Sequence, residues 1–159
     1  MSDLLSNVVV PLATDDDAVA TARALARVLP GEATVTAVHV IETTAGAPDK
    51  ASPEARSEQA EGIFATFRRT LDEADADVSV RDRTAYSDDV VEGVLAVARE
   101  LDASAVAFVP RGGSRLVRFL AGDVALGLVE AADRPVVSLP DPAEDANAEA
   151  DADERTNDD

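Results

Sequence analysis

The chain has no cysteine, one histidine and few aromatic residues. The lack of cysteine excludes disulfides, thiolate catalysis and cysteine-based zinc sites. His39 would have to serve in any Ser-His-Asp triad, but it lies within an apolar run, so we interpret it as a structural residue. Aromatic residues make up 3% of the chain, which disfavours the stacking of nucleic-acid bases on the protein.

Positive charge is scarce as well. The 159 residues include 32 acids and 14 bases, and Lys50 is the only lysine, so the formal net charge is -18. Such a surface repels itself at low ionic strength, whereas at molar salt the Debye length falls to about 3 Å and screens the repulsion. We therefore predict a halophilic protein that does not bind the nucleic-acid backbone. The alternative is an ordinary acidic protein with an acidic tail.

Long apolar runs are missing too. No run approaches the roughly 20 residues that a membrane span needs, and the acidic start at Met1–Asp3 is unlike a signal peptide. We therefore predict a cytoplasmic protein without membrane insertion. Apolar residues nevertheless make up 46% of the chain, which is enough for the core of one globular domain.

Short apolar runs alternate with amphipathic segments along the chain. The amphipathic segments predict four helices, one after each of Thr14, Ser52 and Asp89 and one over Asp123–Ala132. The apolar runs predict five strands, at Asn7–Pro11, Thr34–Ile41, Val78–Thr84, Ala105–Val109 and Pro135–Leu139. This alternation predicts an α/β fold with a five-stranded parallel sheet covered on both faces. Such sheets bind ligands at the carboxyl ends of their strands. The third strand alternates apolar and polar residues, which places it nearer an edge.

The apolar spacing also predicts which face each helix buries. The expected face of the first helix is Val19, Ala22, Ala26 and Leu29. That of the second helix is Ala60, Ile63, Phe64, Phe67, Leu71 and Ala74. That of the third helix is Val91, Val94, Leu95, Ala98 and Leu101. Gly62, within the second helix, has no evident role in this pattern.

A loop rich in glycine and arginine follows the fourth predicted strand. Gly112 lies in this loop, Arg111, Arg115 and Arg118 lie in or beside it, and no acid occurs between residues 103 and 122. A glycine loop between a strand and a helix presents backbone N–H groups to an anion, so phosphate is the first candidate ligand. Alternatively, these arginines form ion pairs with the acidic surface or across a dimer.

Two acidic stretches stand apart from this loop. Asp15, Asp16 and Asp17 could hold Mg²⁺ near the first loop, but such a run more often caps a helix, so we predict no metal except Mg²⁺ that accompanies a nucleotide. Asp141–Asp159 contains nine acids, one arginine and almost no large apolar residue. We predict that it is a disordered acidic tail, separate from a domain at residues 1–140.

Together these features resemble the universal stress protein family. The resemblance covers roughly Asn7 to Leu139 and rests on the order of the elements, the glycine loop and three phrases. The phrases are Val9–Pro11, Val38–Val40 and Arg134–Val137. The resemblance implies the strand order 3-2-1-4-5 and a homodimer through the last strand, where Val136, Val137 and Leu139 are apolar.

The ATP-binding members of this family carry the motif Gly-x2-Gly-x9-Gly-Ser/Thr after the fourth strand. Gly112 matches the second glycine, Gly122 matches the third, and Val124 fits the position next after the motif. Val109 stands in place of the first glycine, and Asp123 in place of the serine or threonine. A branched side chain obstructs close approach of the backbone to a ligand, and a carboxylate at a helix N-terminus competes with phosphate. We therefore predict a degenerate motif with weak ATP binding.

The first loop departs from the family pattern as well. The family usually has an acid two residues after Pro11, where this chain has Ala13, whereas Pro11 and Val40 match positions near the adenosine. The resemblance thus implies a ligand site of nine residues. They are Pro11, Ala13, Val40, Val109, Arg111, Gly112, Gly122, Asp123 and Val124.

The function implied by the resemblance is stress response or signalling, with weak binding of ATP or another anionic ligand and no catalytic residues. The alternative is an interaction module that has lost nucleotide and binds, as a dimer, a client protein or a transporter. A third interpretation is a nucleotide hydrolase of the same architecture. That enzyme would need a phosphate-binding first loop, which residues 12–15 do not supply.

Overall fold

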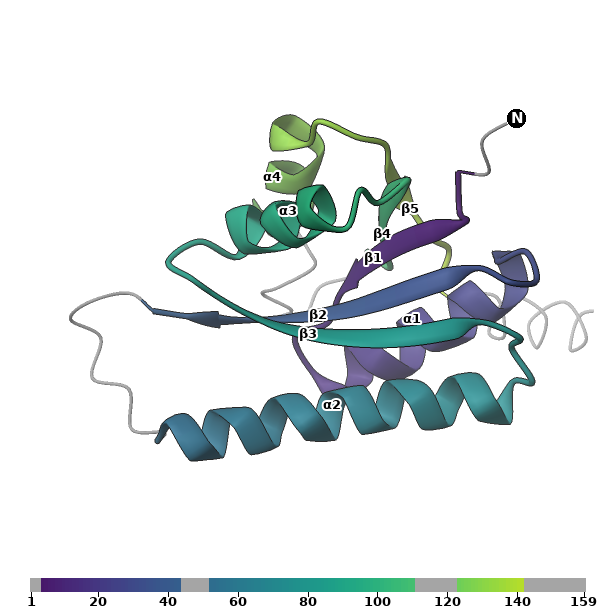
Figure 1. Cartoon of the computed structure of the whole chain (residues 1–159), viewed down its shortest axis with the longest axis horizontal. Helices are drawn as coiled ribbons and strands as arrows, with labels where there is room; N and C mark the ends of the chain where they lie inside the picture. The colour runs from purple at the N-terminus through teal and green to yellow at the C-terminus, as the bar shows by residue number, and fades with distance from the viewer. Residues whose placement is uncertain (1–3, 44–51, 111–122, 142–159) are drawn as a thin grey trace, which may run out of the picture.

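The computed structural model describes residues 4–43, 52–110 and 123–141 of the chain. Five strands of these residues form one parallel sheet in the order β3-β2-β1-β4-β5 (Figure 1). The strands are β1 (Asn7–Pro11), β2 (Thr34–Glu42), β3 (Ser79–Ser87), β4 (Ala105–Phe108) and β5 (Val136–Ser138). The predicted fold class and strand order are therefore confirmed, with β3 at an edge of the sheet.

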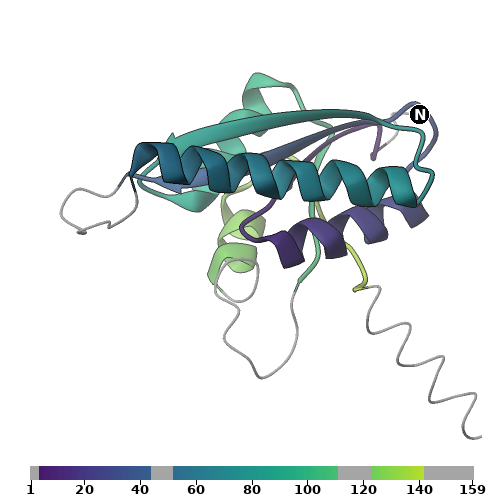
Figure 2. The ribbon, with the colours of Figure 1, turned by 90° about the horizontal axis from the view of Figure 1, so that it is seen from below.

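Four helices within the described ranges cover the sheet. They are α1 (Asp15–Val28), α2 (Pro53–Glu73), α3 (Val90–Glu100) and α4 (Asp123–Ala131). α1 and α2 lie side by side on one face, and α3 and α4 lie on the other (Figures 1 and 2). Because the strands are parallel, their carboxyl ends all meet at one edge of the sheet. None of these helices is both long enough and apolar enough to cross a membrane.

The valines of β1 separate two hydrophobic clusters. Val8 and Val10 pack with α1 and α2, around Phe67, whereas Val9 packs with α3 and α4, around Leu95. Successive side chains of a strand point to opposite faces, so a strand covered on both faces is apolar throughout. This explains why β1 appears in the sequence as a continuous apolar run.

The buried face of α1 differs from the predicted one. Ala22 is buried as expected, but Val19, Ala26 and Leu29 are only partly buried. The residues that α1 buries are Asp17, Ala18, Thr21, Ala22, Ala24 and Leu25. Alanine occurs on several sides of this helix, so apolar spacing does not define a single stripe. The polar Asp17 and Thr21 also face inward, which a hydrophobic pattern cannot show.

The faces of α2 and α3 follow the prediction more closely. α2 buries Ile63, Phe64, Phe67 and Leu71 together with Ala60. Ala74 was expected on this stripe but is the exposed C-cap, because α2 ends one residue earlier. α3 buries the expected residues Val94, Leu95 and Ala98, and half-buries Val91 and Leu101. Large apolar side chains at a spacing of three and four residues define a face more sharply than alanines do.

The start of α1 is a capping box. The Thr14 hydroxyl accepts a hydrogen bond from the Asp17 backbone N–H at 3.1 Å, and the Asp17 carboxylate accepts from the backbone N–H of Thr14 at 3.2 Å. The same carboxylate oxygen accepts from the N–H of Ala13 at 3.1 Å. Asp17 is 3% exposed, so this acid stabilises the helix start and the loop before it.

Arg134 joins the end of α3 to the strand β5. Its Nη1 donates hydrogen bonds to the carbonyl oxygens of Ala98 at 2.9 Å and Ala103 at 2.8 Å. The Ala98 carbonyl belongs to the last turn of α3, where a cation is favourable, and the Ala103 carbonyl lies in the turn between α3 and β4. The neighbouring Asp133 accepts from Arg134 Nε at 3.1 Å. This hydrogen bond is the main cause that lowers the pKa of the Asp133 carboxyl below its usual value.

Candidate functional site

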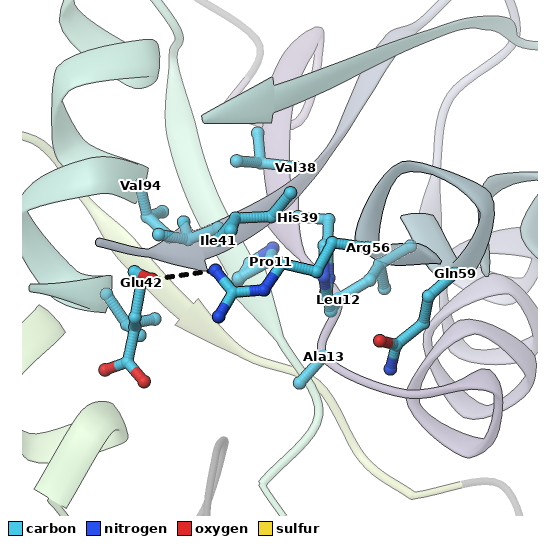
Figure 3. Close-up of a pocket in the computed structure, with 12 residues that line it drawn as sticks. Pro11, Leu12, Ala13, Val38, His39, Ile41, Glu42, Arg56, Gln59 and Val94 are labelled. Carbon is cyan, nitrogen blue, oxygen red and sulfur yellow. Dashed lines mark hydrogen bonds between the residues drawn. The ribbon is translucent and has the colours of Figure 1, made fainter. Parts of the chain in front are cut away.

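A pocket of about 280 Å³ lies at the carboxyl ends of β1 and β2. Pro11 ends β1, and Leu12 and Ala13 follow it along one side of the pocket. The last part of β2, from Val38 to Glu42, forms the floor. Figure 3 shows these residues around one hollow. The pocket therefore lies where parallel sheets of this kind commonly bind ligands.

The apolar wall of the pocket comes from β2 and α3. Val90 and Val94 of α3 line it together with Val38 and Val40. α3 approaches β2 closely at Gly93, where an added Cβ would lie 3.0 Å from both methyl carbons of Val40. Glycine at this position thus allows α3 to rest directly on Val40. The valines of this wall are suited to contact an aromatic or aliphatic ligand group.

Polar groups reach the pocket from α2. Arg56 lies in the first turns of α2, is half-buried, and donates from Nη1 to the backbone oxygen of Glu42 at 3.2 Å. Gln59 lies three residues further along the same helix and lines the same pocket. Ser52 caps this helix by accepting a hydrogen bond from the N–H of Ala55 at 3.1 Å. The cap holds the start of α2 in helical form and so positions Arg56.

The loop after β1 is held in place by β2. The Leu12 N–H donates to the carbonyl of Val38 at 2.8 Å, and His39 Nδ1 lies 2.8 Å from the carbonyl of Leu12. A carbonyl oxygen only accepts, so Nδ1 carries the proton of this hydrogen bond. The N–H groups of Ala13 and Thr14 donate to the Asp17 carboxylate. The loop is therefore restrained by β2 at Leu12 and by α1 at Ala13 and Thr14. The pocket wall at Leu12 and Ala13 is therefore preformed.

The predicted site residues fall into three groups. Pro11, Ala13 and Val40 line this pocket together. Val109 is 3% exposed and packs in the core cluster beside α1 and α2, and Val124 packs against the other cluster. Neither Val109 nor Val124 is a lining residue of the pocket.

The remaining predicted residues belong to the loop after β4 or to the start of α4. Arg111, Gly112 and Gly122, together with the neighbouring Arg115 and Arg118, lie outside the described residues. Asp123 is the first residue of α4. The loop starts from β4, which pairs with β1 on the side away from β2. The pocket and the start of this loop are therefore on opposite sides of β1.

The chain matches a known protein family. The model of the universal stress protein family matches residues 5–140. The chain belongs to this family. None of the curated protein sequences matches it significantly.

Solved universal stress proteins share the fold of this one. The structure from Archaeoglobus fulgidus is 18% identical, covers 84% of this chain and 97% of its own, and has a TM-score of 0.59. A universal stress protein in complex with cAMP is 16% identical, covers 86% and 98%, and has a TM-score of 0.55. A family member from Arabidopsis thaliana with AMP bound is 16% identical, covers 87% and 94%, and has a TM-score of 0.51.

The acids near the first loop of this universal stress protein act in helix capping and side-chain hydrogen bonds. Asp17 caps α1, and Asp15 Oδ1 accepts from the hydroxyl of Thr66 at 3.3 Å. Across the described ranges, no three histidine, aspartate or glutamate side chains gather in a group that could hold a metal ion. The hydrogen bonds of Asp17 thus support the capping interpretation for this residue of the acidic run.

Sequence reasoning missed Arg56, Gln59 and Glu42 as pocket residues of this universal stress protein. A signal for Arg56 was present, because it lies four residues before Ala60 and extends the buried stripe of α2 toward its N-terminus. No comparable signal existed for Glu42. It lines the pocket because β2 runs on past its predicted end at Ile41.

Proposed function

We propose that this universal stress protein is a cytoplasmic stress-response or signalling protein that binds ATP, another adenine nucleotide or a different anionic ligand weakly. The observation that carries the proposal is the preformed pocket at the ends of β1 and β2, which brings together Pro11, Ala13 and Val40. Its apolar wall suits a base, and its polar side suits a sugar or phosphate. The AMP and cAMP complexes of proteins with this fold support the same ligand class.

Weak rather than strong binding is proposed because the family motif is degenerate. Val109 occupies the place of a glycine, and an aspartate takes the first position of α4, where a serine or threonine is usual. A carboxylate at a helix N-terminus competes with phosphate for the backbone N–H groups and the positive end of the dipole. We propose nucleotide dissociation constants of roughly 0.1–1 mM.

A binding role without turnover is part of this proposal. Among the described residues that line the pocket, there is no serine, threonine or cysteine that could act as a nucleophile. His39 donates its Nδ1 proton to the Leu12 carbonyl, an interaction that serves the fold. Magnesium would enter only with the phosphates of a nucleotide.

We further propose that residues 1–140 form the stress-protein domain and that residues 141–159 form an acidic tail. The family match ends at residue 140, in support of this boundary. A homodimer through β5 is proposed as well, because β5 lies at an edge of the sheet. Leu139 is already buried in the chain's own core, so Val136, Val137 and the strand backbone would make the contact.

A second candidate function, an interaction module for a client protein or transporter, rests on a different observation. Leu126 and Val129 on α4 are 56% and 60% exposed. Exposed large apolar residues on one helix are a common feature of contact surfaces. This candidate would gain support if the pocket bound no nucleotide.

Calorimetry in multimolar KCl tests the proposal, with ATP, AMP and cAMP titrated into the full chain. We expect weak binding of at least one nucleotide, and stronger binding by Asp123→Ser. Ala13→Trp, at a partly exposed residue of the pocket wall, should fill the pocket and abolish binding, whereas Leu126→Ala, on the exposed face of α4, should bind like the unchanged protein. Micromolar ATP affinity would refute the degenerate-motif argument. Absence of binding by every nucleotide would favour the interaction module.

A further inference from the structure

The strand β3 leaves one of its two sides open. It is the outermost strand of the sheet and pairs with β2 over its nine residues, Ser79–Ser87 (Figure 1). A typical strand has about five to six residues, so this edge is long. The backbone groups along an open edge can pair with a further strand, and proteins commonly keep such edges short or cover them.

The hydrogen bonds at both ends of β3 show which backbone groups face outward. The N–H of Ser79 donates to the carbonyl of Ala33 at 2.9 Å, and the carbonyl of Ser87 accepts from the N–H of Thr43 at 3.0 Å. The backbone groups of successive strand residues point to opposite sides, and β3 pairs with β2 residue by residue. The odd-numbered residues therefore bond toward β2, and the even-numbered ones face outward. The outward residues are Val80, Asp82, Thr84 and Tyr86.

These four residues offer their backbone donors and acceptors to a partner. No strand lies beyond β3 in the sheet of the described residues, and none of the four makes a backbone hydrogen bond on that side within those residues. An extended segment laid along β3 could therefore form a ladder of hydrogen bonds. In this mode of binding the backbone supplies the affinity, and the side chains beside it select the segment.

The α2 side of this edge fits apolar side chains of a partner. Val80 packs against the core cluster of α1 and α2, and Thr84 and Tyr86 point to the same side because strand side chains alternate. Tyr86 is 65% exposed, more than any other large hydrophobic residue among those described. A β-branched or aromatic residue on an added strand would pack against this ring.

The α3 side of the edge carries two arginines. Arg83 donates to Glu100 of α3 at 2.6 Å, and Arg81, two residues earlier, points to the same side. Arg81 is exposed and makes no ion pair with any described residue. The chain has 32 acids and 14 bases, so an arginine without a neighbouring acid is exceptional on this surface. An acid on an added strand would lie beside it.

A second copy of β3 fits this edge less well. Antiparallel pairing of two copies would bring Arg81 and Arg83 of both to one face of the sheet, and like charges that lie opposite each other are unfavourable. Each copy also carries a formal charge of -18. The charges therefore favour a segment that contributes acids on this face.

We propose that the β3 edge is a docking site for an extended segment of another protein, in which acidic residues alternate with β-branched or aromatic ones. The backbone of the segment bonds to the four outward residues, its acids lie beside Arg81 and Arg83, and its apolar residues pack against Tyr86. At molar salt the repulsion between distant acids is screened within about 3 Å. No residue of β3 lines the candidate pocket, so this proposal does not depend on nucleotide binding.

Fluorescence anisotropy with labelled peptides tests the proposal, on the full chain in about 2 M KCl. The probe alternates glutamate and valine over about eight residues. One control peptide has lysine in place of glutamate, and another carries an N-methyl group on every residue and so has no backbone donor. We expect saturable binding of the glutamate peptide, binding of the lysine peptide at least about threefold weaker, and none of the N-methylated peptide.

Three variants examine the edge itself. Arg81→Glu should reverse the preference between the glutamate and lysine peptides. Arg23→Glu, at an exposed residue of α1, changes the net charge equally and should keep the preference. Thr84→Pro removes one outward donor without removing a bond to β2, and should weaken the glutamate peptide about three- to tenfold. Thermal unfolding should show that each variant is folded.

Several outcomes would overturn docking of another protein. They include no binding of the glutamate peptide, equal binding of the lysine peptide, and binding that survives N-methylation. If the peptide bound only after removal of residues 141–159, the chain's own acidic segment would occupy the edge instead. If the full chain formed a dimer that Thr84→Pro dissociated, the occupant would be a second copy.

Discussion

The Nδ1 atom of His39 lies 2.8 Å from the carbonyl oxygen of Leu12. The only histidine of the chain thus ties β2 to the loop after β1, at the floor of the candidate pocket. The N–H of Leu12 in turn donates a hydrogen bond to the carbonyl oxygen of Val38 in β2. The histidine therefore shapes the ligand site through the backbone, which is a structural role.

Replacement of His39 should cost stability. In His39→Leu the carbonyl of Leu12 loses its donor, and an unsatisfied buried acceptor costs about 1–3 kcal/mol of unfolding free energy. Denaturant unfolding in high-salt buffer measures this loss. His39→Gln, which keeps a donor, should lose less. Equal stability of His39→Leu and the unchanged protein would show that the bond contributes nothing.

Replacement by alanine should change the unfolding free energy in opposite directions at two helical glycines. An added Cβ at Gly62 would meet no atom within 4 Å, so Gly62→Ala should stabilise α2 by about 0.5–1 kcal/mol. At Gly93 the Cβ would lie 3.0 Å from Val40, so Gly93→Ala should cost about 1–3 kcal/mol through overpacking. Chemical unfolding of both variants gives the comparison. The same sign for both changes would contradict this interpretation.

Arg134 should contribute far more to stability than a surface arginine. Its side chain is 14% exposed and donates to the carbonyls of Ala98, in the last turn of α3, and Ala103, in the turn after it. Arg134→Ala should lower the unfolding free energy by roughly 2–4 kcal/mol, since each lost bond involves a charged donor. Arg83→Ala, whose partner Glu100 is exposed, should cost less than about 1 kcal/mol. Similar losses of unfolding free energy for the two variants would show that Arg134 contributes no more than a surface arginine.

Ionisation of Asp133 should make the stability of the folded protein depend on pH in the acid range. Its pKa is lowered mainly by the hydrogen bond from Arg134, so the folded state favours the ionised carboxylate. The stabilisation is present above the pKa of the unfolded chain, about 3.9 for aspartate, and is lost as the pH falls through the lower folded pKa. Unfolding midpoints from about pH 5 to pH 2 should fall less steeply for Asp133→Asn than for the unchanged protein. If the unfolding midpoints of the two proteins fell equally with pH, Asp133 would make no such contribution to stability.

Salt should stabilise the folded chain. The formal net charge of -18 destabilises a compact state unless counterions screen it, so the melting temperature should rise between about 0.1 and 2 M KCl. A variant without residues 141–159 loses nine acids and one arginine, which changes the charge from -18 to -10. Its salt response should be smaller but still present. A response that vanishes with the tail would favour an ordinary acidic protein.

Local periodicity explains which parts of the fold could be predicted. Ile63, Phe64, Phe67 and Leu71 define one stripe of α2 because large apolar residues are absent from its other sides. The same reasoning failed for α1, where alanines occur on several sides and the inward Asp17 is polar. Asp17 faces inward because it accepts backbone hydrogen bonds at the helix start, a requirement that hydrophobic spacing does not contain.

The alternation of strands and helices and the two-faced core were determined by the sequence itself, because apolar periodicity and turn residues act over short distances along the chain. The strand order came only from the resemblance to the universal stress protein family, because local periodicity does not say which strands are neighbours. Only the tertiary structure decided the composition of the pocket. Arg56 meets Glu42 across 14 positions of sequence, and Gly93 meets Val40 across the helix–sheet contact. Such pairs depend on how helices and strands pack together, so no local pattern contains them. The ligand-binding surface is therefore a property of the assembled sheet and its helices.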